Sequence, residues 1–329
     1  MTGFGVPAGT WLQLYRGAMR GGRAELLRYL DEARELHTTG AAAGVVLHGF
    51  PRELEANAAG LATECRARSL PFAFGWGLDG TRDNDNTALT PTEKGASMGR
   101  VLAAHPDAWG VLDAEGRWDT DGGDGMHEAG ALAMGAALRA LAPAAVLCDQ
   151  PWPMPDQHGG PRKAALPLDA GGPWIGYPLD EFASYVQWRA PQLYWTNWTQ
   201  RDRYRFVCAW SEREWATADK TLGPVGLTRP RTVTVQGYGH EPDPWALADA
   251  LLARRDRPTI MWVNPSRDRT LAYRVLRAVA ALARLGYLVD GRSHVESVRA
   301  FQRAAGLVED GLLGARSLAK LEPQRKGVA

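Results

Sequence analysis

Short apolar segments alternate with longer helical segments over most of the chain, and this alternation restricts the fold more than any other feature. Strands are expected at residues 4–6, 41–50, 71–80, 108–116, 144–151, 190–198, at either 223–230 or 232–239, and at 258–265. Helices are expected at residues 23–36, 53–68, 94–104, 127–141, 179–188, 202–217, 244–255 and 270–285. Continuous apolar strands separated by helices are typical of a parallel sheet buried on both faces. Eight such units predict an α/β fold, a (β/α)8 TIM barrel followed by a small three-helix C-terminal domain.

Polar and aromatic residues recur at the carboxyl ends of the predicted strands. They are His48, Trp76 with Asp79, Asp113 with Glu115, Asp149 with Gln150 and Trp152, Tyr194 with Asn197, Gln236 with Tyr238, and Trp262 with Asn264. In a barrel these ends meet at one mouth, where the active site of the fold lies. No G-x-G-x-x-G follows the first predicted strand, which disfavours dinucleotide binding.

One pair of acidic residues stands out at the end of the fourth predicted strand. Asp113 and Glu115 are two residues apart, and side chains at that spacing on a strand point to the same face. Crowding two carboxylates raises the pKa of one of them, so that it can act as a general acid while the other stays charged. Glycoside hydrolysis uses this division of roles. We expect Glu115 to be the general acid and Asp113 to orient or support it.

The D-x-E at 113–115 resembles the end of strand four in two families of barrel glycosidases. Family-25 lysozymes carry Asp-x-Glu there, with the Glu as the acid, but residues 4–10 lack the Asp that those enzymes place on strand one. Family-18 chitinases carry D-x-x-D-x-D-x-E, of which only the last D-x-E is present, since Val111 replaces the preceding Asp. Tyr194 and Trp262 match the Tyr and Trp that this family offers on strands six and eight. The resemblance implies a glycoside hydrolase without choosing the family.

Further residues at the predicted mouth are candidates for substrate binding. Tyr194, Asn197, Tyr238 and Asp149 are expected to position the substrate or stabilise an intermediate. The chain has 13 Trp, and aromatic faces are common platforms for sugar rings. The candidate platforms are Trp76, Trp152, Trp195 and Trp262.

The segment from Leu282 to Leu321 has its own helical pattern. Val295, Val298 and Phe301 share the face of one helix, Gly306 ends it, and Asp310 with Gly311 forms a turn before a last short helix. The segment is similar to the peptidoglycan-binding type 1 domain in LGY-x-x-D-G, VRAFQ, GL-x-x-DG and G-x-x-S. After Asp290 and Gly291 the family's usual G-x-x-T is replaced by a shortened RSHVES. The predicted domains are a barrel at 1–280 and this module at 281–329.

Bulk composition excludes several classes of function. The net charge is +1 with no basic run, so nucleic acid is not an expected partner. No apolar run is long enough to insert into a membrane, and no signal peptide is visible. We expect synthesis in the cytoplasm, followed by action on the cell wall after release or delivery. A phage or injection-system particle is one candidate partner.

Other chemistries lack their motifs. There is no H-E-x-x-H for zinc and no G-x-S-x-G for a serine nucleophile, and hydrolysis by two carboxylates requires no metal or cofactor. The three Cys suggest buried thiols rather than disulfides. The sequence therefore predicts an enzyme of the endolysin or lysozyme type that hydrolyses peptidoglycan. Two alternatives stay open, namely a non-catalytic wall-binding or structural component of a phage or phage-tail-like particle, and a glycosidase for chitin or another polysaccharide.

Overall fold

The computed structural model describes residues 5–14, 22–78, 89–114, 128–150, 179–190, 192–193, 234–236, 247, 251–252, 256–263, 269–289 and 293–321. Its strands are β1 (Gly9–Leu14), β2 (Gly44–Gly49), β3 (Phe72–Gly77), β4 (Trp109–Asp113), β5 (Leu147–Asp149), β6 (Trp188–Arg189), β7 (Gln192–Leu193), β8 (Thr234–Gln236) and β9 (Pro258–Val263). Its helices are α2 (Arg23–Thr38), α3 (Pro51–Ala67), α5 (Pro91–Ala104), α6 (Glu128–Leu141), α7 (Leu179–Ala183), α10 (Arg269–Arg284), α11 (His294–Ala304) and α12 (Ala315–Leu321).

All the described strands belong to one parallel sheet. The order is β6-β5-β4-β3-β2-β1-β9-β8-β7, and each neighbouring pair is parallel. The two ends of this order, β6 and β7, are consecutive in the chain and separated by two residues. The segment 188–193 therefore borders both β5 and β8, and the pairing returns to its start as in a TIM barrel.

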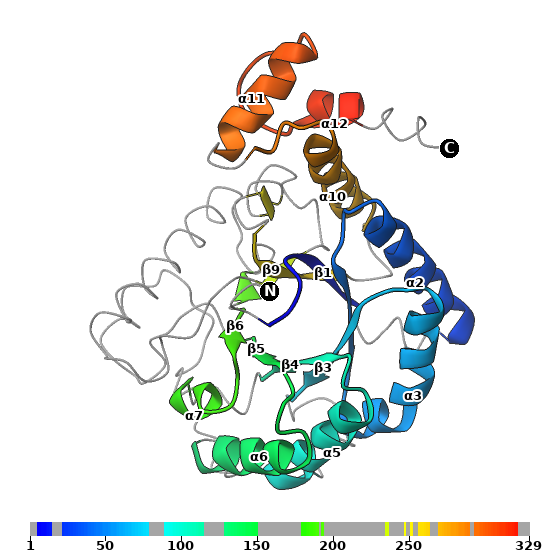
Figure 1. Ribbon diagram of the computed structural model, residues 1–329, viewed down its shortest axis with the longest axis vertical. Coiled ribbons are helices and arrows are strands. Elements are labelled where there is room, and N and C mark those ends of the chain that lie inside the picture. The colour runs from blue at the N-terminus through cyan, green and yellow to red at the C-terminus, as the bar shows by residue number, and fades with distance from the viewer. Residues whose placement is uncertain are drawn as a thin grey trace, which may run out of the picture.

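Helices α2, α3, α5, α6, α7 and α10 surround the strands (Figure 1). One large apolar cluster joins the helices to the outward-facing side chains of the strands, such as Leu12, Leu47, Phe74 and Leu112. A strand exposes alternate side chains on opposite faces, so the residues between these point into the barrel. Within the described residues, no helix is both long enough and apolar enough to span a membrane.

A second apolar cluster fills the inside of the barrel. It contains Trp11, Trp109 and Trp188 together with smaller residues such as Val46 and Cys148. The ring centroids of Trp11 and Trp109 are 4.9 Å apart, and those of Trp109 and Trp188 are 5.2 Å apart. These three rings come from the amino-terminal halves of their strands and close the barrel below the predicted mouth.

Two predicted strands are displaced in the structure. The first strand is Gly9–Leu14 and not residues 4–6, because the longer segment supplies alternating side chains for both faces, with Trp11 inside and Leu12 outside. The sixth begins at Trp188, where a helix was expected to end, and that helix stops at Ala183. Of the two candidates for the seventh strand, residues 232–239 are correct, since they contain β8.

Helices α5 and α6 approach each other through glycine. A Cβ placed on Gly95 would overlap the carbonyl oxygen of Met134, and one on Gly99 would lie 3.0 Å from the carbonyl oxygen of Leu138. Both carbonyl groups belong to the backbone of α6, which cannot rotate away as a side chain can. This close packing therefore depends on glycine one turn apart on α5.

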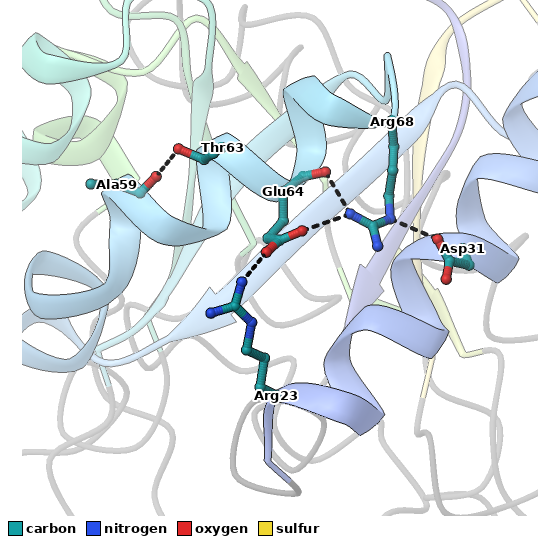
Figure 2. Close-up of polar contacts among 6 residues, drawn as sticks. All are labelled: Arg23, Asp31, Ala59, Thr63, Glu64 and Arg68. Carbon is teal, nitrogen blue, oxygen red and sulfur yellow. Dashed lines mark hydrogen bonds and ion pairs between the residues drawn. The ribbon is translucent and has the colours of Figure 1, made fainter.

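Ion pairs connect α2 and α3 on the outside of the barrel (Figure 2). Glu64 accepts hydrogen bonds from Arg23 at 2.7 Å and from Arg68 at 2.8 Å, and Arg68 also donates to Asp31 at 2.7 Å. The guanidinium of Arg68 lowers the pKa of Glu64, with Arg23 adding to the effect. Arg23 and Asp31 are largely exposed, so the pairs Arg23–Glu64 and Arg68–Asp31 contribute little to stability.

Helices α11 and α12 follow α10 and pack against it. Val298, Phe301, Leu318 and Leu321 belong to the same apolar cluster as Leu282 of α10. Figure 1 shows the two helices beyond α10, at one end of the molecule. The predicted boundary between residues 280 and 281 falls inside α10, because this helix covers the barrel and also supports the C-terminal helices.

The buried amide of Gln302 organises the loop between α11 and α12. Its Nε2 donates to Asp310 Oδ1 at 2.7 Å and to the carbonyl of Leu312 at 2.9 Å, and its Oε1 accepts from the backbone N–H of Gly311 at 2.8 Å. Gly311 has a φ of 77°, a conformation that favours glycine. The predicted turn at residues 310–311 is thus held from inside the module.

Replacing Gln302 with leucine is expected to lower the free energy of unfolding by about 2–3 kcal/mol, because buried partners of the amide lose their hydrogen bonds. Urea denaturation followed by circular dichroism measures the loss. Arg303→Leu, one residue along on an exposed position, is the matched control and should change stability by less than about 0.5 kcal/mol. Equal effects of both variants would contradict the assignment of Gln302 as the centre of the loop.

Candidate active site

Asp113 is the last residue of β4, and its carboxylate is held on both sides. His48 Nε2 lies 3.1 Å from Oδ2, and Gln192 Nε2 donates to Oδ1 at 2.7 Å. The three side chains come from β4, β2 and β7, and all are buried. Strand ends far apart in the chain therefore meet around one carboxylate, as the predicted convergence requires.

A chain of amide groups continues from Asp113 across the barrel. Gln192 Nε2 also donates to the carbonyl of Gln150 at 3.1 Å. Gln150 and Gln13 form a reciprocal pair, with distances of 2.9 and 3.2 Å between their amide nitrogen and oxygen atoms. Gln150 Nε2 uses its second hydrogen on Thr234 Oγ1, at 2.8 Å. The hydrogen bonds among Gln13, Gln150 and Thr234 hold these buried side chains in place, which rigidifies the interior of the barrel beneath Asp113.

His48 is neutral in this environment. Burial lowers the pKa of His48 to about 3, and the carboxylate of Glu53 acts weakly in the opposite direction. A neutral imidazole facing a carboxylate donates through the nitrogen that faces it, so Nε2 carries the proton. His48 thus supplies a hydrogen bond to Asp113 rather than a positive charge.

His48 is expected to make folding less favourable as the pH falls. In the unfolded chain its pKa is about 6.5, so between pH 6.5 and pH 3 the unfolded chain binds a proton that the folded chain does not. Going from pH 7 to pH 5 should remove about 2 kcal/mol of stability through this group. The measurement is urea denaturation of the wild type and of His48→Gln at both pH values.

The His48→Gln comparison also removes the contribution of Asp149. Burial raises the pKa of Asp149 to about 6, so Asp149 favours folding as the pH falls through the same range. Because both proteins keep Asp149, its effect cancels in their difference. The stability gap between wild type and His48→Gln should change by about 2 kcal/mol between the two pH values, and a constant gap would show that His48 is not held neutral.

Two predicted mouth residues lie on the opposite face of the sheet. Trp76 is fully buried in the outer apolar cluster, because its neighbours Gly75 and Gly77 take the inward positions of β3. Asp149 is also fully buried, and its Oδ2 lies 3.7 Å from the guanidinium of Arg189. The expectation that these two side chains reach the mouth is corrected by the alternation of their strands.

Trp262 lies at the predicted place. Its ring centroid is 4.7 Å from that of His48, at an interplanar angle of 61°. Its side chain is only 6% exposed, and the other four Trp of the described segments are more deeply buried. Within these segments, tryptophan serves mainly as core, contrary to the expectation of several exposed sugar platforms.

The remaining predicted site residues lie outside the described residues. They are Glu115, Tyr194, Asn197, Tyr238, Trp152 and Trp195. Their proposed roles stay predictions.

Gln13, Gln192 and Thr234 belong to the hydrogen-bond network that includes Asp113 but were not predicted from the sequence. Gln13 lies between Leu12 and Leu14 in β1, and Thr234 begins β8, so each is a polar residue in a buried strand. A polar residue in a buried strand is the signal that could have found them. His48 was noted only as a strand-end residue, although it contacts Asp113 directly.

Two cysteines of the described part of the chain, Cys65 and Cys148, are buried free thiols. No group of three or more His, Cys, Asp and Glu is arranged there to hold a metal. Burial raises the pKa of the Cys148 thiol far above its ordinary value and raises that of Cys65 to about 12. Both thiols are therefore inert core groups, as predicted for Cys148.

Comparison with solved structures identifies the fold. The catalytic domain of the major endoglucanase from Xanthomonas campestris pv. campestris matches with a TM-score of 0.52 and 12% identity, covering 84% of this chain and 95% of that one. An endocellulase from Pyrococcus horikoshii in complex with cellotetraose matches with a TM-score of 0.52 and 9% identity, covering 82% and 92%. A cellulase in complex with an inhibitor gives 0.53 and 8% identity, covering 84% and 93%. The chain has the TIM-barrel-like α/β fold of these proteins.

No protein-family model matches the chain, and no curated protein matches it in sequence. The likeness to the endoglucanase, the endocellulase and the cellulase is therefore one of fold.

Proposed function

We propose that the protein is a glycoside hydrolase that cleaves the glycan strands of peptidoglycan by carboxylate acid–base catalysis. The observation that carries the proposal is the position of Asp113, at the carboxyl end of β4 with both carboxylate oxygens held by N–H donors. Glu115, two residues further, is the proposed general acid. Asp113 orients this acid or supports the positive charge that develops at the anomeric carbon.

The fold, and the solved structures that share it, support glycoside hydrolysis as the general class of reaction. TIM barrels place their active sites at the carboxyl ends of the strands, where Asp113, His48 and Trp262 lie. The structures that share the fold include an endoglucanase and an endocellulase in complex with cellotetraose. A carboxylate fixed at this end of the barrel fits hydrolysis of a glycosidic bond.

The C-terminal helices support the choice of peptidoglycan. The sequence from Leu282 to Leu321 is similar to the peptidoglycan-binding type 1 domain, and its turn at residues 310–311 is held by Gln302. A wall-binding module would raise the local concentration of substrate at the barrel without adding catalytic contacts. In this proposal the protein acts on the wall after release from the cell or delivery by a phage or injection system.

Digestion of purified peptidoglycan with the full-length protein tests the proposal. New reducing ends are the expected product, because a glycosidase cleaves between sugars. New amino termini would instead show a peptidase or amidase, and bound wall without cleavage would show a wall-binding protein.

A glycosidase for another polysaccharide is the second candidate, favoured by the likeness in fold to an endoglucanase, an endocellulase and a cellulase. Parallel assays on cellotetraose and chitotetraose separate it from the first. This candidate would be favoured if the protein hydrolysed either oligosaccharide but did not cleave peptidoglycan.

A further inference from the structure

Two buried hydrogen-bond acceptors flank the carboxylate of Asp113. They are Nδ1 of His48, on the Oδ2 side, and Oε1 of Gln192, on the Oδ1 side. Neither atom has a hydrogen-bond partner within the described part of the chain. A buried acceptor left without a partner costs about 1–3 kcal/mol, so such atoms in an active site point to a ligand that supplies the missing donor.

The orientation of the Gln192 amide follows from its partners. One end of the amide faces the carboxylate of Asp113 and the carbonyl of Gln150, at 2.7 and 3.1 Å. Both partners are acceptors, so this end must be the NH₂ group. The other end is therefore the carbonyl oxygen Oε1, which can only accept.

The orientation of the His48 ring follows from the glycines of β3. A Cβ placed on Gly75 would lie 3.1 Å from Cδ2 of His48, and one on Gly77 would lie 3.2 Å from Cε1. Gly77 is nearer the carboxyl end of the strand, so the edge of the ring that carries Cε1 and Nδ1 is turned toward the mouth. Because Nε2 holds the proton that is donated to Asp113, Nδ1 presents a bare lone pair.

Both side chains are fixed before any ligand arrives. His48 lies over the two glycines with its ring 4.7 Å from that of Trp262, and Gln192 donates both of its amide hydrogens. Acceptors held in this way lose little conformational entropy on binding. These two acceptors also disfavour a ligand with a carboxylate beside Asp113, because carboxylate oxygens would face Nδ1 of His48 and Oε1 of Gln192 with no hydrogen to share.

We propose that His48 Nδ1 and Gln192 Oε1 accept hydrogen bonds from hydroxyl or acetamido N–H groups of the sugar bound at Asp113. The two residues then determine specificity for a neutral sugar with donors on both sides of the carboxylate, such as an N-acetylhexosamine, over a uronic acid. This inference rests on the proposed glycosidase function.

Nuclear magnetic resonance of the full-length protein with ¹⁵N-labelled histidine tests the inference. The probes are chitotetraose and soluble glycan fragments of peptidoglycan, added to the Glu115→Gln variant to slow turnover. The Nδ1 resonance of His48, assigned by its loss in His48→Gln, is expected to shift on saturation with a probe that binds. Binding with an unchanged Nδ1 resonance would overturn the inference and leave the proposed function standing.

Two substitutions at position 48 separate recognition from the support of Asp113. Glutamine places an N–H donor near the position of Nε2 but lacks the Nδ1 acceptor, whereas asparagine places an oxygen near Nδ1 but does not reach Asp113. His48→Gln should weaken binding of the probe by about tenfold, the effect of one lost hydrogen bond, and His48→Asn should weaken it less. The reverse order would show that His48 acts only through Asp113.

Gln192→Met and His105→Gln complete the comparison. Methionine removes the acceptor Oε1 together with the N–H donors to Asp113 and Gln150, so binding should weaken by about tenfold or more. His105 lies against Phe74 on the outer side of the barrel, and its replacement should leave binding unchanged. If neither probe binds and no glycan is cleaved, the proposed function fails, and the inference fails with it.

Discussion

Replacing Glu115 with glutamine is expected to lower the rate of glycan hydrolysis by about 10²–10⁴-fold, with a much smaller change in KM. Glutamine has nearly the same size and shape but cannot donate a proton to the leaving oxygen, and general acid catalysis contributes a factor of this order. The measurement is the release of reducing ends from purified peptidoglycan at a series of substrate concentrations. Full activity in this variant would overturn the assignment of Glu115 as the acid.

Asp113→Asn is the matched variant for the second carboxylate. The carboxylate accepts from both His48 and Gln192, whereas an asparagine amide has one accepting oxygen and turns its NH₂ toward the other donor. The variant should therefore lose activity through a misplaced and uncharged side chain, by roughly 10²-fold or more. An Asp113→Asn protein that stays folded and active would show that the D-x-E pair is not the catalytic centre.

Replacing Gly95 with alanine is expected to lower the free energy of unfolding by roughly 2 kcal/mol or more. Alanine normally favours a helix over glycine by about 1 kcal/mol. At this position the added carbon would overlap the carbonyl oxygen of Met134, so α5 and α6 must move apart and lose packing. Thermal or urea denaturation measures the change.

Gly60 provides the control for that prediction. It lies in α3 on an exposed face, and a Cβ there would meet nothing within 4 Å. Gly60→Ala should therefore stabilise the protein by about 0.5–1 kcal/mol through helix propensity alone. If both substitutions stabilise the protein, the close approach of α5 and α6 is wrong.

The helical and apolar patterns were enough to predict most of the barrel elements that the structure describes. Helices at residues 23–36, 53–68, 94–104, 127–141 and 270–285 agree with α2, α3, α5, α6 and α10 to within three residues at each end. The helical spacing of their apolar residues indicates directly which face of each helix is buried. The first strand was misplaced because Phe4 to Val6 is apolar, whereas Gly9–Leu14 carries Thr10 and Gln13 among its apolar residues.

The sequence by itself determined that polar side chains gather at the carboxyl ends of the strands, because parallel strands of a barrel all end at one mouth. It thereby placed Asp113 and Trp262 where the structure has them. Only the tertiary structure decided which strand-end side chains turn inward, since neighbouring residues on a strand face opposite ways and the ring of strands fixes which face is inside. For this reason the side chains of Trp76 and Asp149 point outward, whereas those of His48 and Gln192 point inward and contact Asp113. It also paired Gln13 with Gln150, residues 137 positions apart in the chain that no local pattern connects.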